Sequence, residues 1–221
     1  ELQRAGRTVF QGRLHTSDGD YHWYRFYMAV VFDDKRQIKR VLGNVLDIND
    51  TQNKFARMQH KAERDPLTGI YNRAVFEKYV NEVLADSSKR QHAFFLLDID
   101  DFKKINDGYG HNAGDFVLKR FAGIVDGIVR KCEGQIVAGR WGGEEFLILY
   151  YGENKEDFYM LLEYIRMKIY EAQFLYDRNR LSVSVTIGMA AFAKDMSLDE
   201  IINNADMKLY EGKKSGKNKV M

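Results

Sequence analysis

The 221-residue sequence is poor in residues that impose strong local or covalent constraints, with one cysteine and one proline. The single cysteine, Cys132, rules out an internal disulfide framework and fits a reducing compartment. We expect it to act as a small packing residue rather than a nucleophile. The longest apolar runs, such as Met28–Phe32 and Ala93–Leu97, are too short to span a bilayer.

A dominant charge of one sign is missing as well. The 34 basic and 32 acidic residues leave a formal charge of +2, so the overall field gives no reason to expect a nucleic-acid or membrane partner. A nucleotide-sized anion would need a local site. The chain opens on Glu1-Leu2-Gln3-Arg4, without a signal-peptide pattern or an initiator methionine. We therefore expect a cytoplasmic fragment of a longer protein, with any membrane anchor of that protein outside this fragment.

The first fifty residues predict a small antiparallel sheet. Three segments rich in β-branched and aromatic residues are separated by short turn-forming stretches, and they span Thr8–Thr16, Tyr21–Phe32 and Ile38–Ile48. Connections this short join antiparallel strands. A sheet of this size needs another layer to cover it.

Two parts of this sheet resemble the C-terminal half of a PAS sensor domain. They are Asp18-Gly19-Asp20-Tyr21-His22-Trp23, which leads into the aromatic central strand, and the closing Gly43-Asn44-Val45-Leu46-Asp47-Ile48. The resemblance implies that residues 1–48 are a partial sensor segment with an incomplete ligand cavity, because the earlier strands and helices of the family are missing. The alternative is a purely structural β-sheet appendage.

Residues 49–64 predict a linker helix, because the segment is polar and lacks glycine and proline. Phe55, Met58 and Ala62 recur at helical spacing and form a narrow apolar stripe. Such a stripe suits pairing with a second copy of the helix, or packing against its own domain. Asp65-Pro66 ends the helix, because proline disfavours helix in the residue before it.

From residue 65 onward, helices alternate with strands. This order predicts an α+β fold, an α/β sandwich with helices packed on a central sheet. The expected helices cover Arg73–Ala85, Ala113–Arg130, Glu156–Gln173 and a last segment opened by the capping box Ser197–Glu200, and the expected strands cover Ala93–Ile99, Ile136–Ala138, Glu145–Tyr151 and Leu181–Ile187.

Carboxylates stand at the end of one strand and beside a glycine turn. Arg140–Phe146 contains Gly142-Gly143 followed by two glutamates, a pattern that also describes a hairpin tip with solvated acids. Asp98 ends a buried strand, where a carboxylate is costly unless it is paired or bound to a cation. If the two strands are neighbours, Asp98 and Glu144 supply the carboxylate pair that Mg²⁺ accepts. We assign Asp100 a structural role, capping the following turn through its own backbone.

The residues after this strand are suited to binding an anion and a nucleotide base. The backbone N–H groups of Asp101–Lys103, together with the Lys103 side chain, form a candidate phosphate site. Asn106 and Asp115 bound a polar loop that leads into a helix, and both side chains can hydrogen-bond to the edge of guanine. The alternatives are a turn residue for Asn106 and a helix-start charge for Asp115. His111 has no neighbours that suggest zinc.

Five blocks in this order together resemble the GGDEF diguanylate cyclase domain and extend over residues 65–221. They are Asp65–Arg73, Asp98–Asp115, Arg140–Phe146, Ser184–Gly188 and Ala205–Asn218. The resemblance implies a sheet like the palm of polymerases and nucleotide cyclases. It also implies condensation of two GTP molecules into cyclic di-GMP, with release of pyrophosphate and dependence on Mg²⁺, with Mn²⁺ as an alternative ion.

The resemblance also implies roles for individual residues. Asp98, the Ile99 carbonyl and Glu144 would bind the metal, and Glu145 would assist there or activate the 3′-hydroxyl. Asn106 and Asp115 would recognise guanine, with His111 near the ribose or base. Asp101, Phe102, Lys103, Gly143, Lys213 and Lys217 would surround the phosphates, with Lys103, Glu144 and Glu145 as the catalytic side chains.

The family picture requires two such domains face to face, so a homodimer controlled by the N-terminal segment is expected. The rival hypothesis is a non-catalytic GTP-binding module that signals by association. Two departures from the family pattern matter. Lys217 replaces a frequent arginine and loses bidentate phosphate binding. Glu133-Gly134-Gln135-Ile136 occupies the place of the Arg-x-x-Asp product-inhibition motif, so we expect no tight feedback through that site.

Overall fold

The computed structural model describes residues 6–17, 19–85, 91–132, 136–152, 155–191 and 196–221. The chain forms two compact units, Glu1–Ala62 and Glu63–Met221, and each is treated by itself. The Asp18 and Glu133–Gln135 positions discussed above lie outside the described residues. Within the described part, no helix combines the length and apolar character needed to cross a membrane.

The first unit contains the expected antiparallel sheet. Its strands are β1 (Arg7–His15), β2 (Tyr21–Phe32) and β3 (Ile38–Asp47), in the order β1-β2-β3, so the strand prediction is confirmed. Phe10, Phe26 and Val45 are aligned across the three strands, and the Phe10 and Phe26 rings stack at 4.7 Å.

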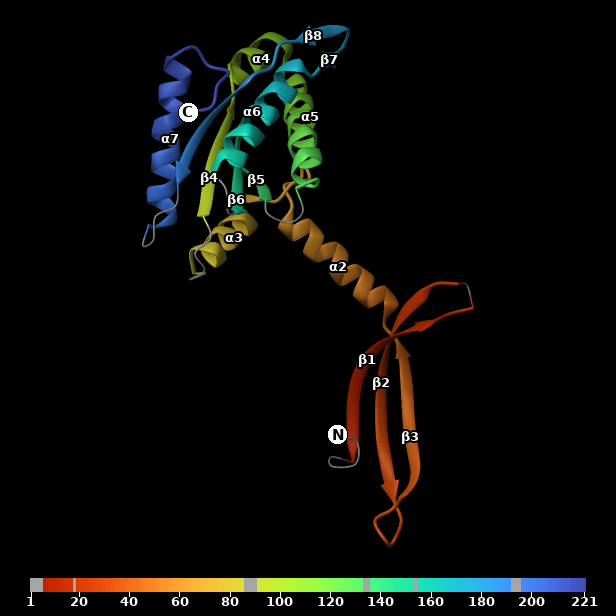
Figure 1. Cartoon of the computed structure of the whole chain (residues 1–221). Coiled ribbons are helices and arrows are strands. Elements are labelled where there is room, and N and C mark those ends of the chain that lie inside the picture. Colours follow the sequence, from red (N-terminus) through yellow and green to blue (C-terminus); the bar gives the residue numbers. More distant parts are fainter. Residues whose placement is uncertain (1–5, 18, 86–90, 133–135, 153–154, 192–195) are drawn as a thin grey trace. The chain divides into compact units, whose positions relative to one another are not determined.

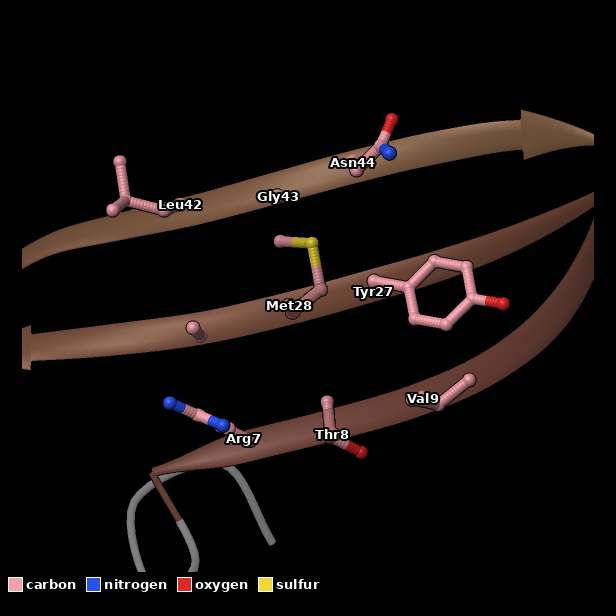
Figure 2. Close-up of a pocket in the computed structure, with 9 residues that line it drawn as sticks. Arg7, Thr8, Val9, Tyr27, Met28, Leu42, Gly43 and Asn44 are labelled. Carbon is pink, nitrogen blue, oxygen red and sulfur yellow. The ribbon is translucent and has the colours of Figure 1, made fainter.

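Both faces of this sheet remain largely uncovered. Among the described hydrophobic side chains of the first unit, only Val30 and Ile48 are buried. A shallow apolar hollow of about 300 Å³ lies across the three strands. Figure 2 shows residues that line it, with Met28 beside Gly43. Within the described residues of the first unit, the sheet therefore lacks the second layer that its composition requires.

The helix predicted at residues 49–64 is confirmed as α2 (Asn49–Glu63), which has no buried residue. Two residues of the expected apolar stripe, Phe55 and Met58, are 66% and 68% exposed. Phe55 and Met58 are therefore not packed against the rest of the first unit.

The second unit is built on a four-stranded antiparallel sheet in the order β5-β6-β4-β9 (Figure 1). Its strands are β4 (Gln91–Ile99), β5 (Ile136–Gly142), β6 (Glu145–Gly152) and β9 (Val185–Ala191). The accompanying helices are α3 (Arg73–Ala85), α4 (Phe102–Tyr109), α5 (His111–Val129), α6 (Lys155–Glu171) and α7 (Leu198–Lys214).

Helices cover both faces of this sheet. Because side chains alternate along a strand, Phe95 and Leu97 of β4 join the core formed with α5 and α6. Phe94 and Leu96 join the core formed with α3 and α7. The expected α/β sandwich with a palm-like sheet is confirmed, and β4-α5-β5-β6-α6-β9 follows the βαββαβ order of ferredoxin-like folds.

Two local predictions are wrong. The expected strand Leu181–Ile187 is divided between β8 (Asn179–Leu181), which pairs with β7 (Phe174–Tyr176), and β9. The β7–β8 turn uses Asp177 and Arg178 at φ 44° and 67°. Hairpin turns with left-handed residues usually have glycine or asparagine at these positions. This turn has neither at its two left-handed positions, so the sequence did not indicate it.

The expected polar loop after Asn106 is the second error, because the segment is helical through α4 and the start of α5. Gly110, at φ 84°, separates the two helices. Phe102 and Ile105 are buried and anchor α4 to the core. Tertiary packing therefore outweighs the weak helix propensity of this polar, glycine-containing segment.

A glycine on β9 allows α7 to pack against the sheet at very short range. A Cβ atom at Gly188 would overlap the Ala205 carbonyl oxygen and the Leu209 backbone nitrogen. Both of these atoms belong to the helix backbone, so they cannot move aside as a side chain could.

Gly188→Ala should therefore destabilise the second unit by about 1–3 kcal/mol. The control is Gly123→Ala on the exposed side of α5, where an added Cβ meets nothing within 4 Å, and it should be neutral or stabilising by up to ~1 kcal/mol. Urea unfolding followed by circular dichroism measures both. Wild-type stability for Gly188→Ala would contradict the close approach of α7 to β9.

Candidate functional site

The acids expected to form the site meet at one end of the sheet. Asp98 is aligned with Glu145 on β6 and with Thr186 on β9. Aligned residues on adjacent strands point to the same face, so Asp98 and Glu145 both face α7. The predicted neighbouring position of the two strands is confirmed, but the register places Glu145, rather than Glu144, opposite Asp98. The Glu144 carbonyl accepts a hydrogen bond from the Ile99 N–H at 3.5 Å.

Burial and mutual repulsion make these acids difficult to ionise. Asp98 is 8% exposed, and burial raises its pKa, against the opposing effect of Lys213 and with a further increase from Glu144. Burial likewise raises the pKa of Glu145, and the charges of Asp98, Glu144 and Asp206 add to the shift. A cation placed among the carboxylates would relieve both effects.

The donor set fits a hard divalent cation that also uses substrate oxygens. Lys213 Nζ lies 2.6 Å from Asp98 Oδ1, yet this buried oxygen accepts no properly directed hydrogen bond. Among the residues that the structure describes, no three His, Cys, Asp or Glu side chains form a complete metal cluster. Two carboxylates and a carbonyl instead suit Mg²⁺, which usually keeps water and phosphate among its ligands.

Asp100 has the expected structural role, but the expected partner is wrong. Its carboxylate is 5% exposed and accepts hydrogen bonds from Ser184 Oγ at 2.7 Å, Thr186 Oγ1 at 2.6 Å and the Asn218 N–H at 3.0 Å. These partners lie far along the chain, not in the following turn. Asp100 thus joins the end of β4 to β9 and to the segment after α7.

The start of α4 supplies unpaired backbone donors. Asp101 takes a left-handed conformation, with φ 54°, directly before the helix. The first hydrogen bonds back to its carbonyl come from the N–H groups of Lys104, at 2.8 Å, and Ile105, at 3.4 Å. The N–H groups of residues 101–103 therefore precede the helical hydrogen-bond pattern, as in an anion-binding helix start. The Lys103 side chain is exposed beside them.

The two C-terminal lysines reach the same region. Lys213 contacts Asp98, as described above, and Lys217 Nζ lies 2.8 Å from Asp101 Oδ2. The contact with Lys217 is the main cause of the lowered pKa of Asp101, and it raises the pKa of Lys217. The structure therefore brings the predicted phosphate ligands from α4 and from the end of α7 together.

The residues expected to recognise guanine lie on α4 and α5. Asn106 is half-buried on α4, and its amide oxygen occupies the space that a Cβ atom at Gly114 would fill. Gly114 is followed directly by Asp115, which is exposed, as is His111 one turn earlier. The close packing of the two helices thus sets Asn106 near Asp115.

Arg140 lies in one of the five blocks, but its role was not predicted from the sequence. Its Nη1 donates to Asp65 Oδ1 at 3.0 Å, and its Nε and Nη2 donate to the Gly143 carbonyl at 3.1 and 2.8 Å. Asp65 also accepts from the N–H and hydroxyl of Thr68. Arg140 thereby fastens the glycine turn to the entry of the second unit. No local sequence signal joins partners 75 residues apart.

Asp206 was also missed. Asp206 lies on α7, and its charge helps to raise the pKa of Glu145. It precedes Lys213 by seven residues, which is about two helical turns. That spacing is the signal that could have placed it on the same face of the helix as Lys213.

An antiparallel palm-like sheet with acids at the end of its central strand and cations beside them defines a nucleotide-cyclase type of domain. Residues 62–219 match the family model described as diguanylate cyclase, GGDEF domain. The chain belongs to this family.

Curated relatives carry the same domain within longer chains. Diguanylate cyclase A of Treponema denticola is 36% identical over 133 residues, covering 60% of this chain and 35% of that protein. Diguanylate cyclase DgcP of Pseudomonas aeruginosa is 35% identical over 164 residues, covering 73% of this chain and 24% of that protein. The chain thus spans about a third or less of these two relatives.

Solved structures agree on the fold. The coiled coil and GGDEF domain of DgcB from Caulobacter crescentus, in complex with c-di-GMP, superposes with a TM-score of 0.72 at 24% identity, over 79% of this chain and 92% of that chain. Diguanylate cyclase SiaD from Pseudomonas aeruginosa, in complex with its activator SiaC, gives a TM-score of 0.69 at 29% identity, over 79% of this chain and 68% of that one.

The hydrogen bonds around Asp65 generate a prediction about stability and pH. Burial opposes ionisation of Asp65, but the bonds from Thr68 and Arg140 outweigh it and hold the pKa below its ordinary value of 3.8. Asp65→Asn should cost about 1–3 kcal/mol at pH 7. Because the folded pKa is lowered, the cost is fully present above 3.8 and disappears as the pH falls through the folded pKa.

Denaturant unfolding of wild type and variant across this pH range measures the difference. Asp126→Asn removes a surface pairing with Arg130 and serves as the control, with an expected cost below ~0.5 kcal/mol. A pH-independent difference for Asp65→Asn would refute the assigned role of its charge.

Proposed function

We propose that this chain is the catalytic part of a diguanylate cyclase, which condenses two GTP molecules into cyclic di-GMP and releases pyrophosphate. The observation that carries the proposal is the meeting of Asp98, Glu144 and Glu145 with a helix start and two lysines at one end of the sheet. Carboxylates for a metal and cations for a triphosphate are the two requirements of nucleotidyl transfer.

In this proposal the Asp98 carboxylate, the Ile99 carbonyl and the Glu144 carboxylate hold Mg²⁺, with Mn²⁺ as an alternative. Glu145 assists them or accepts the proton of the attacking 3′-hydroxyl, and its raised pKa suits a proton acceptor. When bound, the ion neutralises charge on the attacked phosphate and on the departing pyrophosphate.

The phosphates are held by groups from two distant parts of the chain. The N–H groups of Asp101, Phe102 and Lys103 bind them at the start of α4, where the helix dipole favours an anion. Lys103, Lys213 and Lys217 add positive charge. Gly143 carries no side chain and lets the nucleotide approach the turn.

Guanine is recognised between α4 and α5. The Asp115 carboxylate accepts from the base N1–H and N2–H groups, and the Asn106 amide completes the edge contact. His111, one turn before Asp115, lies near the ribose or base. Adenine lacks these two donors, so the arrangement favours GTP over ATP.

Each domain presents one nucleotide, whereas the product joins two. We therefore infer that two copies act face to face. The 3′-hydroxyl of the GTP bound to each copy would attack the α-phosphate of the GTP bound to the other, and pyrophosphate would leave. The exposed Phe55 and Met58 on α2 suit pairing of two linker helices. In this proposal residues 1–48 are a PAS-like sensor segment, 49–64 the linker and 65–221 the catalytic domain. We also infer a cytoplasmic location, in keeping with a single, unpaired cysteine.

The decisive test is incubation with GTP and Mg²⁺, alone and with added ATP, followed by identification of the products by mass. In both incubations we expect cyclic di-GMP as the only cyclic dinucleotide, together with pyrophosphate. A protein that binds GTP but forms no product would instead be the non-catalytic signalling module, and a mixed adenine–guanine product would refute the guanine assignment.

Glu144→Gln keeps the shape of the side chain and removes its charge, so turnover should fall at least about 100-fold. GTP binding, measured by calorimetry, should change much less, because the phosphate and base contacts remain. Glu82→Gln neutralises an exposed acid paired with Lys78 and should leave turnover unchanged. Normal turnover by Glu144→Gln would remove Glu144 from the metal site.

Feedback inhibition gives a further prediction. Because Arg-x-x-Asp is absent before the glycine turn, added cyclic di-GMP should not inhibit turnover at concentrations far below that of the substrate. Initial rates at increasing product concentration, together with calorimetry of product binding, measure this. Tight binding that depends on residues 133–136 would contradict it.

A further inference from the structure

Lys217 makes its contact with an acid that stands within the proposed phosphate site. Its Nζ lies 2.8 Å from Asp101 Oδ2, while Asp101 Oδ1 lies 2.9 Å from Lys104 Nζ. Both oxygens of this carboxylate are therefore occupied by lysines. Asp101 directly precedes the N–H groups that open α4, so the carboxylate stands where the helix start favours an anion.

The backbone holds Lys217 firmly in this position. Lys217 and Asn218 are left-handed, at φ 59° and 49°. Asparagine adopts this conformation readily, but a lysine keeps it only when the surroundings enforce it. The Lys217 N–H donates to the Gly212 carbonyl at 3.0 Å. The Asn218 N–H donates to Asp100 Oδ2 at 3.0 Å and lies 3.1 Å from Thr186 Oγ1.

The side chain of Asn218 is anchored as well. Its Oδ1 accepts from Arg166 Nη1 on α6 at 2.9 Å, and Arg166 is also bound to Glu163. The turn that carries Lys217 is thus fixed to β4, β9 and α6 together. The backbone of Lys217 is therefore fixed, and its side chain would reach an incoming phosphate from the same turn from which it now contacts Asp101.

We propose that the Asp101 carboxylate is an internal competitor of the substrate, occupying Lys217 and thereby weakening the affinity of the site for the terminal phosphates of a nucleotide. The inference rests on the proposed function. A bound triphosphate places several negative charges near the start of α4 and repels Asp101. The ion pair is solvent-accessible, with side chains 37% and 39% exposed, and pairs of this kind are weak enough to exchange.

Asp101→Asn tests the inference with little structural disturbance. Asparagine has nearly the same size and tolerates the left-handed backbone. The probe is inorganic tripolyphosphate with Mg²⁺, titrated by calorimetry into the whole chain. We expect roughly three- to ten-fold tighter binding by Asp101→Asn than by wild type. The gain should shrink as salt is added, because exposed charges are screened.

Two further variants decide how the gain arises. Asp126→Asn makes the same change in net charge on α5 and should not alter binding. In a Lys217→Met background, Asp101→Asn should give a clearly smaller gain, because Lys217 is no longer there to be released and only the repulsion by Asp101 and its contact with Lys104 are removed. A gain of undiminished size without Lys217, or equal binding by wild type and Asp101→Asn, overturns the proposal.

The same proteins, incubated with GTP, separate this inference from the proposed function. Tripolyphosphate binding requires no turnover, so the effect of Asp101 is read even if no cyclic di-GMP forms. Absence of product from wild type with an intact gain in Asp101→Asn refutes the catalytic proposal and supports the inference. Cyclic di-GMP from wild type without a gain in Asp101→Asn refutes the inference and leaves the catalytic proposal standing.

Discussion

The register of β4 between β6 and β9 is the constraint on which the second unit depends. A shift by one residue would turn every side chain of β4 to the opposite face. Phe95 and Leu97 would leave the α5–α6 core, and Asp98 would enter it. The hydrophobic pattern therefore fixes where the acids stand. Asp98 faces α7 because its neighbours on the same side, Phe94 and Leu96, are buried against α3 and α7.

Hydrogen bonds that the Asp100 carboxylate accepts extend this constraint beyond the sheet. The carboxylate holds β9 through Thr186 and the C-terminal turn through the Asn218 N–H. A buried carboxylate with three donors is stable where an unpaired one would not be. The order of the phosphate site thus depends on a buried carboxylate that binds the backbone beside Lys217 and so fixes the turn that carries this lysine.

Much of this arrangement could be predicted from the sequence because it depends on periodic patterns. Continuous apolar strands, helical spacing and the Ser197–Glu200 capping box are local signals, and the corresponding elements were confirmed. The β7–β8 hairpin escaped because its turn residues are Asp177 and Arg178 rather than glycine. Side-chain partners were harder to predict, since Asp100 and Asn218 are 118 residues apart and no local pattern joins them.

One guanidinium joins the beginning of the second unit to its acidic turn. The Arg140 fork is planar and rigid, and it holds the Asp65 carboxylate on one side and the Gly143 carbonyl on the other. Asp65 follows two residues after the last residue of α2. The segment that follows α2 and the loop bearing Glu144 are therefore held by the same side chain, so a displacement of either one strains the same set of hydrogen bonds.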